Sequence, residues 1–212
     1  MADKPVLYGF DGSTYVRTLR IILRNKGVDY DQVPVNVLEG EPRQPEHLAR
    51  HPFGKVPVLD IDDMRILETD ACCRYLEATR PGPSAIPVTP KNRARMNTII
   101  SMVNSYGYPA LIGAAGYHLF PDFLGGKDDA AYAKALEDSK TLLTLFMQIK
   151  GDSPWLASEQ GPSLADYFLG PIIFYVALTP AAEALMAIPG MQGWWDKIST
   201  DEAFKATEPD LG

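Results

Sequence analysis

The chain has 212 residues, a net charge of −7, 46% hydrophobic residues and 22% charged residues, which is typical of an ordinary globular protein. The acidic balance argues against nucleic acid as a partner, because phosphate binding needs clustered Lys and Arg. No apolar run approaches the ~20 residues of a membrane helix, and the first residues lack the features of a signal peptide. We therefore expect a cytoplasmic protein with no membrane partner.

Strand and helix patterns alternate over the first eighty residues. Short apolar runs predict strands at residues 5–9, 33–37, 56–60 and 64–67. Pro34 indicates that the second of these strands lies at a sheet edge, and Asp62-Asp63 is a plausible hairpin turn between the last two. Apolar residues at helical spacing, and shorter helical signals, predict helices at residues 14–26, 46–50 and 69–79.

Residues 81–90 are rich in proline and predict a linker between a first domain, 1–80, and a second domain, 91–212. Beyond the linker every pattern is helical. Helices are expected at residues 91–105, 128–150, 163–176, 181–187 and 191–199, the third of them interrupted by Gly170-Pro171. Ser163 and Asp166 have the spacing of a capping box, which stabilises a helix start.

Cysteines and histidines give little sign of chemistry. Cys72 and Cys73 are adjacent, which disfavours a disulfide between them, and we expect buried or inert thiols in a reducing compartment. His47 and His51 are expected at the surface or in a loop. Together with His118 they lack metal-ligand spacing, so no metal is expected.

Residues 51–59 and 67–71 form the most informative stretch of the chain. A cis bond at Val56-Pro57 would turn the backbone groups of Val56 outward, where they could pair with an extended peptide as a sheet edge does. Glu68 and Thr69 open a helix, and the free N–H groups of a helix N-terminus bind carboxylates well. The stretch therefore predicts a peptide-binding site built largely from backbone.

These motifs and the order of elements resemble the cytosolic glutathione transferases, and residues 40–57 are most similar to the plant phi class and related bacterial members. The resemblance implies an α/β thioredoxin-like N-terminal domain (βαβαββα) and an all-α C-terminal domain. It also implies glutathione as co-substrate, a small hydrophobic electrophile, a role in detoxification and a homodimer.

The resemblance assigns a role to each part of the site. Val56, with Pro57 beside it, would hydrogen-bond the cysteinyl residue of glutathione through its backbone. Thr69 would bind the γ-glutamyl carboxylate, and Glu68 would pair with the γ-glutamyl amine. The candidates for the glycine carboxylate are Arg43 and Lys55.

The thiol activator has three candidates. Ser13 falls where serine-type members carry their catalytic hydroxyl, while Tyr8 and Thr14 are alternatives. Lowering a thiol pKa by about two units takes ~2.7 kcal/mol. A hydroxyl bonded to a charged acceptor contributes ~1.5–3 kcal/mol and a helix N-terminus ~0.3–1 kcal/mol, so a serine at a helix start suffices.

The electrophile site is expected between the domains. Its candidate side chains are Phe10, Met102, Tyr106, Tyr108, Tyr117 and His118. Because scattered side chains form this site, the sequence leaves open a glutathione-dependent isomerase, dehalogenase or ether-cleaving enzyme, and also a non-catalytic binder of glutathione or hydrophobic molecules.

Overall fold

The computed structural model of the chain describes residues 4–210 and has two compact units. One comprises the residues up to 84 together with those from 202 onward, and the other comprises residues 85–201. The division between residues 84 and 85 lies within the proline-rich segment 81–90.

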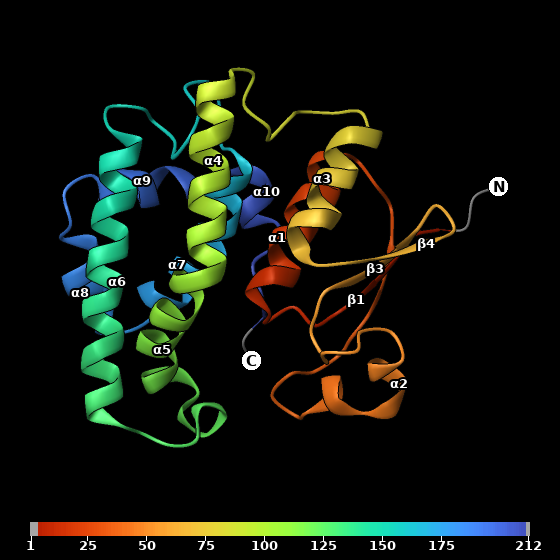
Figure 1. The fold of residues 1–212 in the computed structure, drawn as a ribbon, viewed down its shortest axis with the longest axis horizontal. Helices are drawn as coiled ribbons and strands as arrows, with labels where there is room; N and C mark the ends of the chain where they lie inside the picture. The colour runs from red at the N-terminus through yellow and green to blue at the C-terminus, as the bar shows by residue number, and fades with distance from the viewer. Residues whose placement is uncertain (1–3, 211–212) are drawn as a thin grey trace. The chain divides into compact units, whose positions relative to one another are not determined.

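The first unit is built on a four-stranded sheet of order β2-β1-β3-β4 (Figure 1). The strands are β1 (Val6–Tyr8), β2 (Asp31–Val33), β3 (Val58–Ile61) and β4 (Met64–Leu67). Strand β1 pairs parallel with β2 and antiparallel with β3, and β3 and β4 form an antiparallel hairpin. The unit's helices are α1 (Thr14–Asn25), the 3₁₀ turn η1 (Glu41–Arg43), α2 (Pro45–Leu48), α3 (Thr69–Thr79) and α10 (Glu202–Lys205). Up to α3 the order is βαβαββα, which confirms the prediction.

The hairpin forms where the sequence predicted it. Asp62 and Asp63 have φ of 50° and 59°, the paired left-handed conformation of a two-residue turn that matches the twist of adjoining strands. The predicted strand at 33–37 is wrong beyond Val33, because Pro34 has no N–H for the ladder. Its predicted edge position is confirmed.

Helices α1 and α3 pack against each other and against the sheet. Leu7, Val16 and Leu19 are fully buried in this core. Gly27 follows α1 with φ of 61°, the helix-ending conformation expected there. The C-terminal segment joins the same unit, since the buried Arg17 donates to the Phe204 carbonyl at 2.9 Å and lies over the Phe204 ring at 4.0 Å.

A buried ion pair fixes the end of α1. Lys26 Nζ lies 2.9 Å from Glu77 Oε2 in α3 and donates to the Pro83 carbonyl at 2.8 Å. Both charged side chains are nearly inaccessible, with 2% and 4% of their surface exposed. The pair therefore joins both helices to the segment at which the unit ends.

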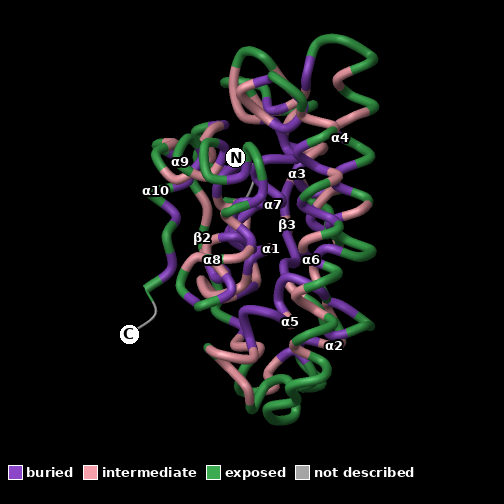
Figure 2. The backbone as a smooth tube through the Cα atoms, turned by 90° about the vertical axis from the view of Figure 1, so that its left-hand side faces the viewer, coloured by how far each residue is buried: buried purple, intermediate pink, exposed green. Residues whose placement is uncertain are grey.

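The second unit is helical, as predicted. Its α-helices are α4 (Pro90–Met102), α5 (Tyr108–Leu119), α6 (Asp129–Lys150), α7 (Leu164–Ala177), α8 (Ala181–Met186) and α9 (Met191–Ile198). The turns η2 (Val103–Gly107) and η3 (Pro121–Leu124) flank α5. Helix α7 is almost wholly buried and packs against α4, α5, α8 and α9 (Figure 2).

Two predictions for these helices are wrong. The helix expected at 91–105 does not end there, because a π-helical turn, η2, continues it into α5. Pro109 lies at the second position of α5, directly after this π-helical turn, in which Tyr108 N–H donates to the Val103 carbonyl five residues earlier. The wider π turn replaces the regular i→i−4 pattern at the point where the Pro109 ring, which has no N–H, has to be accommodated. The Gly170-Pro171 pair does not interrupt α7, since packing around a buried helix overrides local propensity.

Asp166 organises the start of α7, where the predicted capping box is confirmed. Its two carboxylate oxygens accept from Ser163 N–H and O–H, from Leu156 N–H and from Trp194 Nε1–H, at 2.7–2.9 Å. Burial raises the pKa of Asp166, and these four hydrogen bonds oppose that effect. One carboxylate thus joins α7, α9 and the preceding loop.

Candidate functional site

The predicted peptide-binding stretch forms a compact arrangement at one end of the sheet. Val56-Pro57 is a cis peptide bond, as predicted, and lies just before β3. Strand β3 pairs Val58 with Tyr8 on one side and with Leu67 on the other. Continued by one residue, these registers place Pro57 opposite both Gly9 and Glu68. The sheet therefore brings the loop after β1 and the start of α3 to either side of Val56-Pro57.

Glu68 has an unusual backbone at the start of α3. Its φ is 68°, a conformation that a non-glycine residue adopts at a cost of order 1–3 kcal/mol and that is found most often at functional sites. Its side chain is 76% exposed, so its carboxylate can be reached by a ligand. Among the described residues no side chain caps this helix start, which leaves its first N–H groups available to an anion beside the buried Thr69.

Ser13 lies at the N-cap of α1. Its Oγ accepts from Val16 N–H at 3.4 Å, and its N–H donates to the Phe10 carbonyl at 3.1 Å. Gly9 makes this tight turn possible, since a Cβ at that position would lie 2.4 Å from Val16 Cγ2. The hydroxyl oxygen is engaged as an acceptor while its hydrogen remains available to donate.

Three polar side chains that the sequence analysis missed hold the Ser13 loop. Gln32 in β2 donates to the Gly9 carbonyl at 3.0 Å and to Asp11 Oδ1 at 2.8 Å. Arg20 in α1 lies 3.1 Å from the same Asp11 oxygen. No spacing rule predicts this cluster, because its members come from a strand, a loop and a helix.

Arg43, in η1, and Lys55, just before Val56, lie in segments that pack against each other. Gly54 has φ of 58°, and a Cβ there would lie 2.6 Å from the Pro42 carbonyl and 3.2 Å from Arg43 Cδ. The segment 52–55 therefore lies against η1, and both Arg43 and Lys55 are exposed residues. This position leaves both available to a carboxylate.

The expectation that His47 and His51 lie at the surface or in a loop holds only in part: His51 lies in the loop after α2, but neither side chain is at the surface. Only 2% of His47 and 1% of His51 is exposed. His47 Nε2 donates to the Lys55 carbonyl at 2.8 Å, and His51 Nδ1 accepts from Phe53 N–H at 3.3 Å. Each imidazole thus has one hydrogen bond to the backbone of the loop, which offsets part of the cost of its burial, while His47 Nδ1 has no partner within residues 4–210. Their i, i+4 spacing just before the motif was the signal in the sequence.

The alternative activators have different surroundings. The Tyr8 ring lies 4.4 Å from the Arg50 guanidinium, and hydrogen bonds from Arg65 and, to a lesser degree, Tyr8 lower the pKa of Asp60. Thr14 is buried, and its hydroxyl has no hydrogen-bond partner within residues 4–210. Ser13 is more accessible than Thr14.

The electrophile candidates belong to both units. Phe10 lies in the Ser13 loop of the first unit. In the second, Met102 ends α4 half-buried, and Tyr106 is 65% exposed in η2. Tyr117 in α5 donates to Asp129 and stacks on Tyr132 at 4.6 Å. The remaining candidates are Tyr108, whose pKa is raised by burial, and His118, which contacts the rings of Tyr117 and Tyr132.

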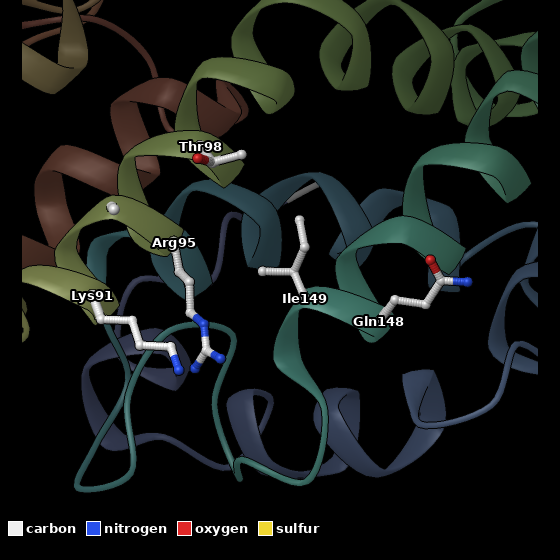
Figure 3. A pocket seen from close by; sticks show the side chains of 6 residues that line it. Lys91, Arg95, Thr98, Gln148 and Ile149 are labelled. Atoms are coloured by element: carbon white, nitrogen blue, oxygen red, sulfur yellow. The ribbon is translucent and has the colours of Figure 1, made fainter.

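A shallow groove in the second unit is a separate feature (Figure 3). Lys91 and Arg95 from α4 point toward the same part of it, opposite Gln148 and Ile149 of α6. None of the electrophile candidates lines this groove. Besides Ala94 and Ile149, the groove is lined by the charged or polar residues Lys91, Arg95, Thr98 and Gln148, whereas a hydrophobic electrophile would be expected to bind among aromatic and aliphatic side chains.

Neither of the two cysteines has an activated thiol. Cys72 and Cys73 are free and buried, and burial raises the pKa of Cys72 to about 12 and that of Cys73 well above its usual value, so the expectation of buried, inert thiols is confirmed. Within residues 4–210 no cluster of three or more His, Cys, Asp or Glu side chains could hold a metal ion. No helix in this part of the chain combines the length and apolar character needed to cross a membrane.

Comparison with known proteins agrees with this geometry. Residues 7–84 match the family described as glutathione S-transferase, N-terminal domain. The chain is 31% identical over 207 residues to a maleylacetoacetate isomerase of Pseudomonas aeruginosa, covering 96% of this chain and 95% of the relative. The chain belongs to the glutathione S-transferase family. It is also 30% identical over 194 residues to glutathione S-transferase 1 of Zea mays, covering 91% of this chain and 90% of the relative.

A solved structure of the family has the same fold. Maize glutathione S-transferase I, in complex with an atrazine glutathione conjugate, superposes with a TM-score of 0.82 at 27% identity, covering 97% of each chain. The resemblance to glutathione transferases and the thioredoxin-like fold with an α-helical region after it are therefore both confirmed.

Proposed function

We propose that this glutathione S-transferase family member ionises bound glutathione to its thiolate and adds the sulfur to a small hydrophobic electrophile. The observation that carries the proposal is the sheet register at Pro57. It sets Gly9, which leads to Ser13, on one side and Glu68, which leads to Thr69, on the other. A tripeptide that lies along Val56 would reach the Ser13 hydroxyl, which can donate to its thiol sulfur, and the Glu68 carboxylate, which can accept from its ammonium group.

Ser13 is the proposed catalytic residue. Its oxygen accepts the capping bond from Val16 N–H, so its O–H points elsewhere and can donate to the sulfur. The ionised sulfur would also face the N-terminus of α1, whose partial positive charge favours an anion. Both contributions stabilise the thiolate, and neither requires a general base.

The remaining groups hold the peptide. Thr69 and the free N–H groups of α3 take the γ-glutamyl carboxylate, and the exposed Glu68 carboxylate takes the amine. Val56 pairs with the cysteinyl backbone, while Arg43 and Lys55 take the glycine carboxylate. Each end of glutathione therefore meets a group of opposite charge.

A glutathione-dependent isomerase is the second candidate. The full-length match to a maleylacetoacetate isomerase favours it. The same thiolate would add reversibly to a conjugated double bond, allow rotation about it and then leave. Phe10, Met102, Tyr106 and Tyr117 are proposed contacts for either electrophile.

Parallel assays separate these functions. The purified protein is given glutathione with an aryl halide, an alkyl halide, a reducible aryl ether or a cis-configured conjugated diketo acid. Conjugate formation supports the first function, and cis–trans conversion without consumption of glutathione supports the second. Binding of glutathione without turnover of any substrate would indicate the non-catalytic binder instead.

We also propose a cytoplasmic homodimer with a role in detoxification. The two free thiols suit a reducing compartment. Phe53 is 72% exposed beside the glutathione loop, and a large exposed aromatic side chain is a suitable contact for a second copy. Sedimentation of wild type and Phe53→Ser tests the dimer.

A further inference from the structure

His51 touches two separate parts of the proposed site. Its Nδ1 accepts from Phe53 N–H at 3.3 Å, so in this arrangement Nδ1 carries no hydrogen and Nε2 carries the proton of the neutral ring. Nε2 lies 3.8 Å from Glu68 Oε1 at the start of α3. The buried His51 imidazole therefore lies between the loop before the cis proline and Glu68, the residue proposed to bind the ammonium group of glutathione.

The surroundings of His51 oppose its protonation at neutral pH. Burial lowers its pKa, the Glu68 carboxylate raises it, and the nearby His47 and Lys55 lower it. A proton on Nδ1 would also set two donors, the ring and Phe53 N–H, against each other. The neutral ring is the form that fits the loop, and the imidazolium is the form that Glu68 favours.

We propose that His51 is a positioning residue that makes glutathione binding sensitive to pH by competing with the γ-glutamyl ammonium group for Glu68. This inference rests on the proposed function. With a neutral ring, the exposed carboxylate is available to the ligand's ammonium. With a protonated ring, a cation already lies beside Glu68, and the two positive charges repel each other in the same small region. Acid therefore weakens binding.

The probe is S-methylglutathione, because it has no thiol to titrate. Its own carboxylates and amine keep their charge between about pH 5 and 7.5, so a change in its affinity reports on the protein. The chain has three histidines, His47, His51 and His118, and histidine is the side chain whose ordinary pKa falls within this range. Dissociation constants are measured by calorimetry across the range.

Two substitutions of His51 each remove one of its two contacts and can keep the other. In His51→Asn the amide oxygen can replace Nδ1 as acceptor for Phe53 N–H, but the contact with Glu68 is lost. In His51→Gln the longer side chain can approach Glu68, but the acceptor for Phe53 is lost. Neither residue titrates. Folding of each variant is checked by its melting temperature, and His118→Gln, in the other unit, is the matched control.

The expected result is a rise in the wild-type dissociation constant of about three- to fivefold toward pH 5, the size of one charge interaction at a solvent-exposed carboxylate such as Glu68. His51→Asn shows no rise between about pH 7.5 and pH 5. His51→Gln binds more weakly throughout and also shows no rise. His118→Gln keeps the wild-type slope.

An analogue of S-methylglutathione in which glutaryl replaces γ-glutamyl, so that the amine is missing, tests the competition itself. Its affinity is expected to stay level or improve in acid, because no ammonium repels the imidazolium. An equal loss of affinity with this analogue overturns the proposal, as does an unchanged slope in His51→Asn. If S-methylglutathione fails to bind wild type at about pH 7.5, the proposed function fails as well. If it binds equally at every pH, this inference alone fails.

Discussion

The proposed glutathione site and the candidate electrophile residues are built in opposite ways. In the first unit, backbone geometry and buried polar groups fix the site: a sheet register, a cis bond, a helix start and two histidines beneath a loop. In the second unit, the candidates are single aromatic side chains on helices. Tyr106 is mostly exposed, whereas Tyr117 is engaged with Tyr132 and Asp129.

This difference indicates which region recognises a fixed ligand and which region can change its substrate. A backbone-built site accepts one shape of ligand, because moving any part breaks hydrogen bonds throughout the loop. Aromatic side chains at helix surfaces can be exchanged without disturbing the helices that carry them. We therefore expect the family to keep its peptide site while its second substrate varies, and the following experiments test how separate the two regions are.

The largest expected effect is on stability, at Asp166 in the second unit. Asp166→Ala leaves the donors of Leu156, Ser163 and Trp194 buried without their acceptor. Such a loss should lower the free energy of unfolding by about 3–5 kcal/mol, measured by urea titration. Asp166→Asn keeps one acceptor oxygen and should cost less.

If the glutathione site depends only on the first unit, S-methylglutathione should bind the folded fraction of Asp166→Ala as it binds wild type. A large loss of affinity in the folded variant would show that the two regions are coupled.

The next effect is expected in segment 52–55, the loop of the proposed glutathione site. Gly54→Ala puts a Cβ 2.6 Å from the Pro42 carbonyl and adds the cost of a positive φ. We expect about 1–3 kcal/mol of destabilisation together with weaker S-methylglutathione binding. Gly40→Ala is the control, because Gly40 has φ of 75° with open space around its Cβ position. Equal effects in both variants would mean that the close approach to η1 is unimportant.

A smaller effect is expected at the support of the Ser13 loop. Arg20→Met leaves the Asp11 carboxylate without its cation. The remaining negative charge should raise the pKa of bound glutathione by about half a unit, the range of a partly exposed ion pair. Asp11→Asn removes the charge itself and should not raise it. A raised thiol pKa in Asp11→Asn would show that the loop geometry, not the charge, is responsible.

The smallest effect concerns stability in acid. Because the pKa of His51 is lowered on folding, the unfolded chain binds more protons than the folded chain as the pH falls below ~6.5. Stability should therefore decrease with acidification through this region, down to the lower folded pKa. Thermal melts of His51→Asn should show a shallower decrease than wild type. Parallel curves would assign the loss to other groups.

The parts of the molecule that the sequence predicts share a local cause. The hairpin at Asp62-Asp63, the capping box of Ser163 and Asp166, and the start of α3 each depend on residues a few positions apart. The cis proline was likewise predictable from its immediate context. Local stereochemistry determines these features, so a pattern of neighbouring residues is enough to find them.

The parts that the sequence misses depend on distant contacts. Gln32, Asp11 and Arg20 meet only because β1 and β2 pair in parallel. His51 lies in a loop, but its burial and its contacts with Phe53 N–H and the Glu68 carboxylate follow only from the fold. The path of α7 through Pro171 likewise results from packing on several sides. Such features follow from tertiary structure and not from spacing.

The most direct test of the central claim, that Ser13 ionises glutathione bound by the first unit, is the thiolate absorbance of bound glutathione as a function of pH. Wild type is compared with Ser13→Ala, Thr14→Val and Tyr8→Phe. We predict that Ser13→Ala raises the thiol pKa by about one to two units while the other variants match wild type. An unchanged titration in Ser13→Ala, or a shift in Tyr8→Phe or Thr14→Val instead, would contradict the account.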